Sequence, residues 1–183
     1  MERKKYFEAT EHENIKEILY DSEKKYGDNT AFILKHKENK DVKYENISYK
    51  RLLEEVNALG TKFYQLGYKD KRIAIVGRNR YEWVLAHLAN LSGGIVSVPL
   101  DKELQVDELE SCIKRSKADV VVFDEKYIEN IEEIKRRNDT NLKEYICMSK
   151  QEDYLDIKQL LEEGKELLAN GDKEYINAEI DSY

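Results

Sequence analysis

Proline, cysteine and long apolar stretches are scarce in this chain of 183 residues. With one proline and eight glycines, few positions force a helix or strand to stop, which predicts long regular elements and no linker. The two cysteines, Cys112 and Cys147, stand outside any C-x-x-C motif, which favours reduced, buried thiols. No stretch reaches the roughly 20 apolar residues of a membrane span, and no apolar segment follows the charged N-terminal stretch as in a signal peptide. We therefore expect a cytoplasmic protein.

The charge pattern is that of a protein with a Lys- and Glu-rich surface. Charged residues make up 38% of the chain, well above the usual quarter, and the net charge is -7. Because the chain is acidic and has no long basic run, nucleic acid is not expected as a partner. The length suffices for one domain with a core, so we expect residues 1–183 to form a single domain with a poorly patterned tail at 172–183.

The most informative segment lies at Arg72–Leu100. An apolar run, Ile73–Val76, ends at a glycine, a helix signal follows, and a second β-branched run occupies Ile95–Val98. This order is typical of a βαβ unit with parallel strands. The alternation continues through Arg72–Met148 and predicts an α/β fold, with an open, mostly parallel sheet and helices on both faces.

Apolar periodicity predicts the remaining elements, including an N-terminal helix and a short antiparallel ribbon ahead of the sheet. The expected helices are Glu13–Tyr26, a helix capped by Ser48 and ended by Gly67, Arg80–Ser92, Val106–Arg115, Lys126–Arg137 and Asp156–Ala169. The expected strands are Thr30–Lys35, Val42–Ile47, Ile73–Val76, Ile95–Val98, Asp119–Phe123 and Leu142–Met148, with a hairpin turn at Lys37–Asp41.

Several short motifs resemble one family. The elements Asn79-Arg80-x-Glu82-Trp83 and Gly94-x-Val96-x-Val98-Pro99-Leu100 resemble the N-terminal region of the adenylate-forming, AMP-binding acyl-CoA synthetases. The first looks most like the long-chain fatty acid branch. Weaker matches in the family's order are Asp28-x-Thr30-Ala31, Ile47-Ser48-Tyr49-x-x-Leu52, Leu66-Gly67 before Arg72-Ile73-Ala74, and Ser116-Lys117-Ala118-Asp119. Leu100-Asp101-Lys102-Glu103 departs from the long-chain pattern, so the acyl chain length is left open.

The resemblance implies that the chain is the N-terminal part of an ATP-dependent acyl-CoA synthetase. Such a parent enzyme activates a carboxylic acid through acyl-AMP and passes the acyl group to CoA, with Mg²⁺ as the metal. The family's phosphate loop, its Mg²⁺ and ribose ligands and its catalytic lysine would lie beyond Tyr183. We therefore assign no catalytic, cofactor-binding or metal residue to this fragment and expect no catalysis by it alone.

Partners follow from the same resemblance. The rest of the ligase chain is the expected partner, and a surface left uncovered would favour self-association. For the parent, the small-molecule partner is a carboxylic acid. The alternative is a stand-alone, non-catalytic α/β module that binds a ligand at the carboxyl ends of its strands.

One loop has the position of an anion site. Gly77-Arg78-Asn79 lies between a strand and a helix N-terminus, where backbone N–H groups can bind phosphate. A lone glycine is neither a P-loop nor a dinucleotide fingerprint. Asn79 as N-cap, with Glu82 three residues later, predicts a capping box worth about 1 kcal/mol. We favour this structural interpretation over a phosphate site.

For the other candidate residues we also favour structural roles. Trp83 could line an acyl or pantetheine tunnel, but we favour packing of its helix on the sheet. His87 is expected to be a packed or rim residue and not a metal ligand. Lys135-Arg136-Arg137 should end a helix, where cations are favourable. The remaining histidines, His12 and His36, lie in polar segments. The adjacent carboxylates are expected on solvated helix faces; these pairs are Glu54-Glu55, Glu132-Glu133 and Glu162-Glu163.

Overall fold

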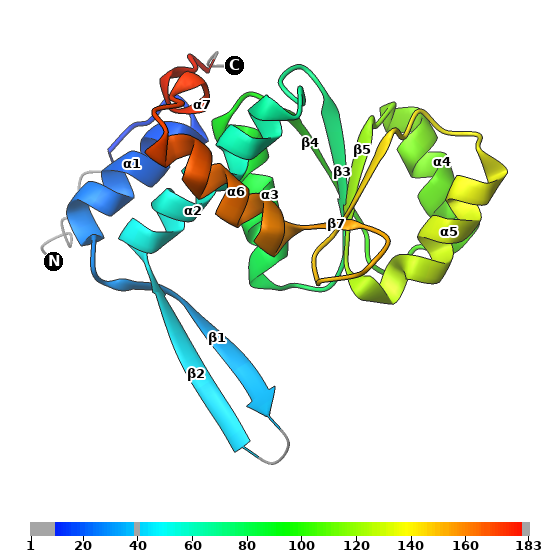
Figure 1. Cartoon of the computed structure of the whole chain (residues 1–183), viewed down its shortest axis with the longest axis horizontal. Helices are drawn as coiled ribbons and strands as arrows, with labels where there is room; N and C mark the ends of the chain where they lie inside the picture. Colours follow the sequence, from blue (N-terminus) through cyan, green and yellow to red (C-terminus); the bar gives the residue numbers. More distant parts are fainter. Residues whose placement is uncertain (1–9, 39–40, 181–183) are drawn as a thin grey trace, which may run out of the picture.

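A computed structural model describes residues 10–38 and 41–180. It contains a sheet of parallel strands with helices on both faces and a long hairpin that stands away from it (Figure 1). The strands of the sheet are β3 (Arg72–Val76), β4 (Val96–Leu100), β5 (Val120–Phe123), β6 (Glu144–Cys147) and β7 (Leu155–Asp156). The helices are α1 (Ile15–Tyr26), α2 (Tyr49–Gln65), α3 (Tyr81–Ser92), α4 (Val106–Ser116), the 3-10 turn η1 (Glu125–Tyr127), α5 (Ile128–Arg137), α6 (Ile157–Ala169) and α7 (Glu174–Asn177).

The sheet has the strand order β4-β3-β5-β6-β7, and every neighbouring pair is parallel. The predicted α/β fold with a parallel sheet is therefore confirmed. Strand β4 contains Pro99, which has no backbone N–H to donate. This is tolerated because β4 lies at the edge of the sheet, where one side of its backbone is not paired with another strand. Strand β7, only two residues long, is an addition that periodicity did not predict.

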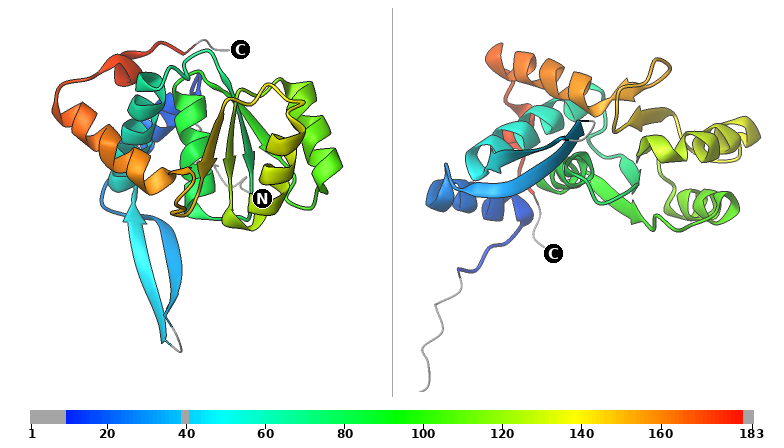
Figure 2. Two further views of the ribbon diagram at one scale, coloured as in Figure 1. Left: turned by 45° about the vertical axis from the view of Figure 1, so that its right-hand side comes forward. Right: turned by 90° about the horizontal axis from the view of Figure 1, so that it is seen from below.

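Strand alternation divides the core between the two faces of the sheet. Ile73 and Ile75 of β3 face the cluster that contains the buried side chains of α2, α3 and α6. Ala74 and Val76 face the cluster built with α4 and α5. Figure 2 shows these two sets of helices on opposite sides of the strands. A strand covered on both faces has to be apolar throughout, which explains the continuous runs in β3 and β5.

Helix ends follow the capping rules at most of the predicted positions. The side chain of Ser48 accepts a hydrogen bond from the backbone N–H of Arg51, as expected for the N-cap of α2. Gly67, just past the end of that helix, has φ +77°, a conformation that glycine adopts without strain. The basic residues expected at the end of α5 do occupy its last turn.

The predicted antiparallel ribbon is confirmed and is longer than expected. Strand β1 (Thr30–Glu38) pairs with β2 (Asp41–Ser48) in a register that places Lys35 opposite Tyr44. Part of the predicted turn at Lys37–Asp41 lies outside the described residues. The hairpin extends away from the helices, and the side chain of Ile33 remains 64% exposed on it (Figure 1).

The segment from 172 onward has little sequence pattern, yet it is anchored as far as the structure describes it. Tyr175 of α7 is fully buried, and its hydroxyl donates a hydrogen bond of 2.8 Å to the carbonyl of Ala89. A methyl group at Gly60 or Gly93 would lie only 2.0 or 2.5 Å from the tyrosine ring. The two glycines therefore create the space on α2 and after α3 that the ring fills.

The two cysteines differ in burial. Cys147 is buried in β6, and desolvation raises the pKa of its thiol. Cys112 on α4 is only partly buried, so the prediction of two buried thiols is wrong for this residue. Both thiols are free. In the described ranges, 10–38 and 41–180, no helix is both long and apolar enough to cross a membrane.

Candidate functional site at the switch point of the sheet

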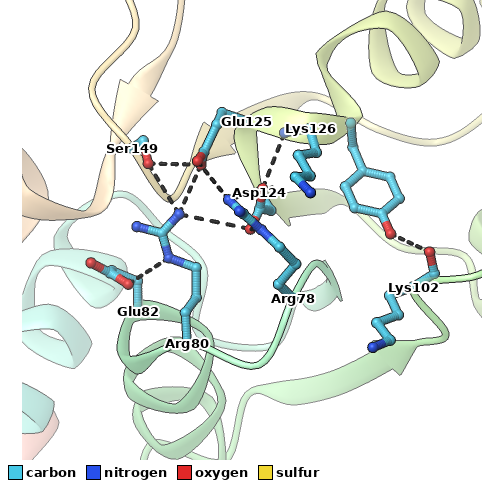
Figure 3. Close-up of polar contacts among 9 residues, drawn as sticks. Arg78, Arg80, Glu82, Lys102, Asp124, Glu125, Lys126 and Ser149 are labelled. Atoms are coloured by element: carbon cyan, nitrogen blue, oxygen red, sulfur yellow. Dashed lines mark hydrogen bonds and ion pairs between the residues drawn. The ribbon is translucent and has the colours of Figure 1, made fainter. Parts of the chain in front are cut away.

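Strands β3 and β5 lie side by side, but their connections leave in opposite directions. The chain passes from β3 through α3 to β4 on one side, and from β5 through α5 to β6 on the other. Open α/β sheets bind ligands at such a point, beyond the carboxyl ends of the strands. The loop after β3 and the residues after β5 therefore form the candidate site (Figure 3).

Arg78 spans the switch point. Its Nε and Nη2 atoms donate to the two carboxylate oxygens of Asp124 over 2.7 and 2.8 Å, and Nη2 also donates to Glu125 over 2.6 Å. Asp124 follows β5 directly and is fully buried, so its charge requires these partners. A side chain at Gly77 would approach the Cβ of Asp124 to 2.8 Å, so this glycine allows the two strand ends to lie close together.

Arg80 makes a second set of ion pairs in the same network. Its Nε donates to Glu82 over 2.6 Å, and its Nη1 donates to Glu125 over 2.8 Å and to Ser149 over 3.1 Å. Ser149, after β6, donates its hydroxyl to Glu125 over 2.7 Å. The network thus joins the ends of three adjacent parallel strands.

The protonation state of Glu125 follows from these contacts. Partial burial alone would raise the pKa of its carboxyl group. Hydrogen bonds from Ser149 and from the backbone, together with the charge of Arg80 and a hydrogen bond from Arg78, outweigh burial and lower the pKa to about 2. Glu125 is therefore ionised at neutral pH and is a poor general acid or base there.

An anion would have to compete for the arginines of this site. Three carboxylates, from Glu82, Asp124 and Glu125, already engage the two guanidinium groups. This arrangement favours the structural interpretation of the Gly77-Arg78-Asn79 loop over the phosphate site. The sequence offered a signal for the acidic partners, because Asp124 and Glu125 come directly after a predicted strand that neighbours the one ending at Gly77.

The predicted capping box at Asn79 is wrong. Helix α3 starts at Tyr81, so the N-cap is Arg80, which makes no side-chain cap hydrogen bond. The carboxylate of Glu82 binds the guanidinium of Arg80 and not a backbone N–H. The ion-pair network at the strand ends displaces the helix start by one residue and leaves Asn79 in the loop.

The prediction of a solvated Glu54-Glu55 pair is wrong for Glu55. This residue is only 4% exposed, accepts a hydrogen bond of 2.7 Å from Nε of Arg51, and accepts one of 2.6 Å from the hydroxyl of Tyr81. Burial, followed by this hydrogen bond, raises the pKa of Tyr81. Sequence spacing contained the signal, because Glu55 lies three residues after Leu52 on the apolar face of α2.

The histidines and the tryptophan have structural surroundings. Trp83 packs against the core cluster, and its ring centroid lies 5.1 Å from that of His87. Nδ1 of His87 lies 2.8 Å from the hydroxyl of Ser97, and burial lowers the pKa of the imidazole. His12 and His36 each contact one carboxylate, Asp21 and Glu45 respectively. His87 is partly buried, which agrees with the prediction of a packed or rim residue.

A hollow of about 680 Å³ lies beside the network. One wall is strand β1, and the other is the loop after β3 with the first turn of α3. Phe32 of β1 and Tyr81 of α3 both line it and meet edge to face, with ring centroids 5.6 Å apart. The hollow is therefore bounded by the hairpin and by the switch point.

ATP and Mg²⁺ do not fit the described residues of this site. Each carboxylate at the strand ends is bound by a guanidinium group, so none offers free oxygen ligands to a hard cation. Across residues 10–38 and 41–180, no cluster of three or more His, Cys, Asp or Glu side chains has the geometry of a metal site.

Comparison with known proteins identifies the family. The family model described as AMP-binding enzyme matches residues 19–177. The long-chain-fatty-acid–CoA ligase 5 of Rattus norvegicus is 33% identical over 141 residues, which cover 74% of this chain and 20% of the rat protein. A mitochondrial medium-chain acyl-CoA ligase of Bos taurus is 33% identical over 89 residues, which cover 47% of this chain and 14% of that protein.

A solved structure shows the same fold. The N-terminal domain of FACL13 from Mycobacterium tuberculosis superposes with a TM-score of 0.67 at 18% identity, covering 93% of this chain and 38% of that chain. This chain thus spans well under half the length of the relatives it matches. The resemblance inferred from the motifs around Asn79 and Gly94 is confirmed: the chain belongs to the family of AMP-binding enzymes, which includes the acyl-CoA ligases.

Proposed function

We propose that this chain is the N-terminal part of an ATP-dependent acyl-CoA ligase that activates a fatty or other carboxylic acid. The match of the AMP-binding family model to residues 19–177, with a long-chain ligase as a relative, is the observation that carries the proposal. We also propose that residues 1–183 act as one domain of a cytoplasmic enzyme.

The chemistry of such a ligase has a general physical logic. A carboxylate is a poor acyl donor, so it is first joined to AMP, with release of pyrophosphate, and the acyl group then passes to the thiol of CoA. ATP, Mg²⁺ and CoA serve this reaction in the parent enzyme, because cations stabilise the charge that moves between phosphoryl groups.

The proposed contribution of this chain is structural. Its parallel sheet and the ion-pair network at the strand ends provide a rigid wall against which the rest of the ligase packs. Since the arginines and carboxylates of the network neutralise one another, we expect the chain alone to bind ATP weakly and to release no pyrophosphate.

The first test is an assay of the isolated chain. With ATP, Mg²⁺, CoA and a long-chain fatty acid, the chain should release no pyrophosphate above a control without protein. Release that depends on the fatty acid would contradict the structural role proposed for the fragment.

The second test reads the native gene beyond the codon for Tyr183. A Ser/Thr- and Gly-rich loop ending in Lys, within a few tens of codons, is the expected result. The extended product should then form acyl-CoA under conditions in which the fragment is inactive. A stop codon at that point would instead favour the second candidate, a non-catalytic binding module, for which the hollow beside the switch point is the supporting observation.

A further inference from the structure

Strand β1 presents its backbone edge to the hollow beside the switch point. Five consecutive residues of β1, Phe32 to His36, line this hollow. Successive side chains of a strand point to opposite faces, so a run of consecutive lining residues means that the edge of the strand, and not one face, borders the space. Figure 1 shows β1 on the side of the hairpin nearer the five-stranded sheet.

That edge has no neighbouring strand within the described residues. β1 pairs with β2 on one side, and its described backbone hydrogen bonds beyond Phe32 are those of this pairing. Alternate residues of an antiparallel strand direct N–H and C=O groups away from the partner. A nine-residue strand without proline therefore offers a row of free donors and acceptors, which is a template for another strand.

The surroundings of the edge define the chemistry of an incoming strand. The paired rings of Phe32 and Tyr81 contribute apolar surface to the lining of the hollow. The guanidinium groups of Arg78 and Arg80 are already paired with carboxylates, and His36 contacts Glu45. Lys35 also lines the hollow, and none of the ion pairs formed within residues 10–38 and 41–180 involves its side chain, so its positive charge favours an acidic side chain on the incoming strand.

The neighbouring hairpin face adds apolar surface. The pairing places Lys35 opposite Tyr44, and residues directly opposite in a ladder lie on the same face, together with Ile33 two residues earlier. Ile33 and Tyr44 are 64% and 66% exposed. An apolar stripe beside a free strand edge is the usual arrangement where a strand is added in recognition.

We propose that the free edge of β1 accepts an extended strand from the part of the ligase that this chain does not contain. The strand would pair with β1 through main-chain hydrogen bonds, place apolar side chains against Phe32 and Tyr81, and place a carboxylate against Lys35. The proposal rests on the proposed function, because the chain spans 20% of the rat ligase and the remainder of such an enzyme must pack somewhere.

The test uses short overlapping synthetic peptides that cover the rat ligase outside the 141 matched residues. Amide exchange of the labelled chain, followed by NMR, reports which backbone groups each peptide protects. We expect a peptide with alternating apolar residues and an acidic residue to protect alternate amides of β1. We expect Lys35→Glu to weaken that binding about tenfold, because it replaces attraction by repulsion.

The matched control is Lys143→Glu. Lys143 is an exposed lysine beside the first residue of β6, at the amino end of the sheet, so this variant makes the same charge change away from the hollow. It should leave the peptide affinity unchanged.

Three results would overturn the inference: no peptide protects β1, Lys35→Glu binds as tightly as Lys143→Glu, or the amides of β1 become protected when the chain alone is concentrated. The last result would mean that a second copy of this chain occupies the edge. These three results do not bear on the proposed function, which the gene sequence and the acyl-CoA assay test separately.

Discussion

At the scale of single residues, the fit of Tyr175 between two glycines makes a sharp prediction. Gly60→Ala places a methyl group 2.0 Å from the tyrosine ring in a fully buried site. Alanine favours a helix over glycine by up to about 1 kcal/mol, but overpacking costs between about 1 and 3 kcal/mol, so we expect a net loss of stability. Urea denaturation monitored by circular dichroism measures the change.

A double-mutant cycle separates overpacking from other effects of Gly60→Ala. In a Tyr175→Ala background, the added methyl group no longer meets a ring, so it should cost much less than in the native chain. Glu54→Ala, an exposed change on the same helix, serves as the control and should shift the stability by no more than about 0.5 kcal/mol. Equal costs of Gly60→Ala in both backgrounds would show that the ring is not the obstacle.

Glu125 gives a prediction on pH dependence. The pKa of this carboxyl group is about 2 in the folded chain and 4.5 without its partners. A carboxyl group with a lowered folded pKa stabilises the fold above its unfolded pKa, and this contribution disappears as the pH falls from 4.5 to about 2. Because Glu125 is partly exposed, we expect its contribution to be about 1 kcal/mol after solvent screening.

The measurement compares urea unfolding of the native chain with that of Glu125→Gln, above pH 4.5 and near pH 2. The native chain should be the more stable of the two at the higher pH, and the difference should shrink towards the lower pH. A difference that is independent of pH would mean that Glu125 acts only through its shape and its neutral hydrogen bonds.

At the same scale, sequence reasoning failed where a charged side chain binds a partner from another element. Adjacent numbering suggested that Glu55 is solvated, but Arg51 and Tyr81 bind it in the interior. Spacing alone places Glu55 on the apolar face of α2, but Tyr81 comes from another helix, so spacing could not identify this partner. The prediction of Asn79 as an N-cap failed for a related reason. Arg80 donates a hydrogen bond to Glu125 across the strand ends, and helix α3 begins one residue later than predicted.

At the scale of elements, the two proposed helix caps can be compared directly. The hydroxyl of Ser48 accepts a backbone N–H at the start of α2, so Ser48→Ala should cost about 1 kcal/mol. Asn79 makes no such bond at the start of α3, so Asn79→Ala should cost almost nothing. Unfolding free energies of the two variants, measured side by side, test this contrast. If Asn79→Ala lowers the free energy of unfolding as much as Ser48→Ala does, Asn79 acts as a helix cap after all.

The parallel sheet could be predicted because strands covered on both faces leave continuous apolar runs in the sequence, as in Ile73–Val76 and Val120–Phe123. Strand β7 and helix α7 could not be predicted. They contain only two and four residues, too few for a period to appear. The position of β7 depends on its pairing with β6, and that of α7 on contacts with α2, which lies far away in the sequence.

At the scale of the whole molecule, the structure divides into a packed body and a projecting hairpin (Figure 2). The body has core clusters on both faces of the sheet, whereas Ile33, Val42 and Tyr44 of the hairpin are exposed. At the base of the hairpin, Ile47 is fully buried and belongs to the body. The outer part of the hairpin therefore has little buried apolar area to hold it closed, and its stability should be lower than that of the body.

Native-state hydrogen exchange measures this difference. The paired amides of the outer hairpin should exchange by local opening, with a free energy well below that of global unfolding and with little dependence on urea, because the opening exposes little new surface. Amides of Ile75 and Val122 in the centre of the sheet should exchange only by global unfolding, with a steep dependence on urea. If the amides of the outer hairpin and of the sheet instead show the same free energy and the same dependence on urea, the hairpin unfolds together with the body. Its free edge is then rigid before any partner strand arrives.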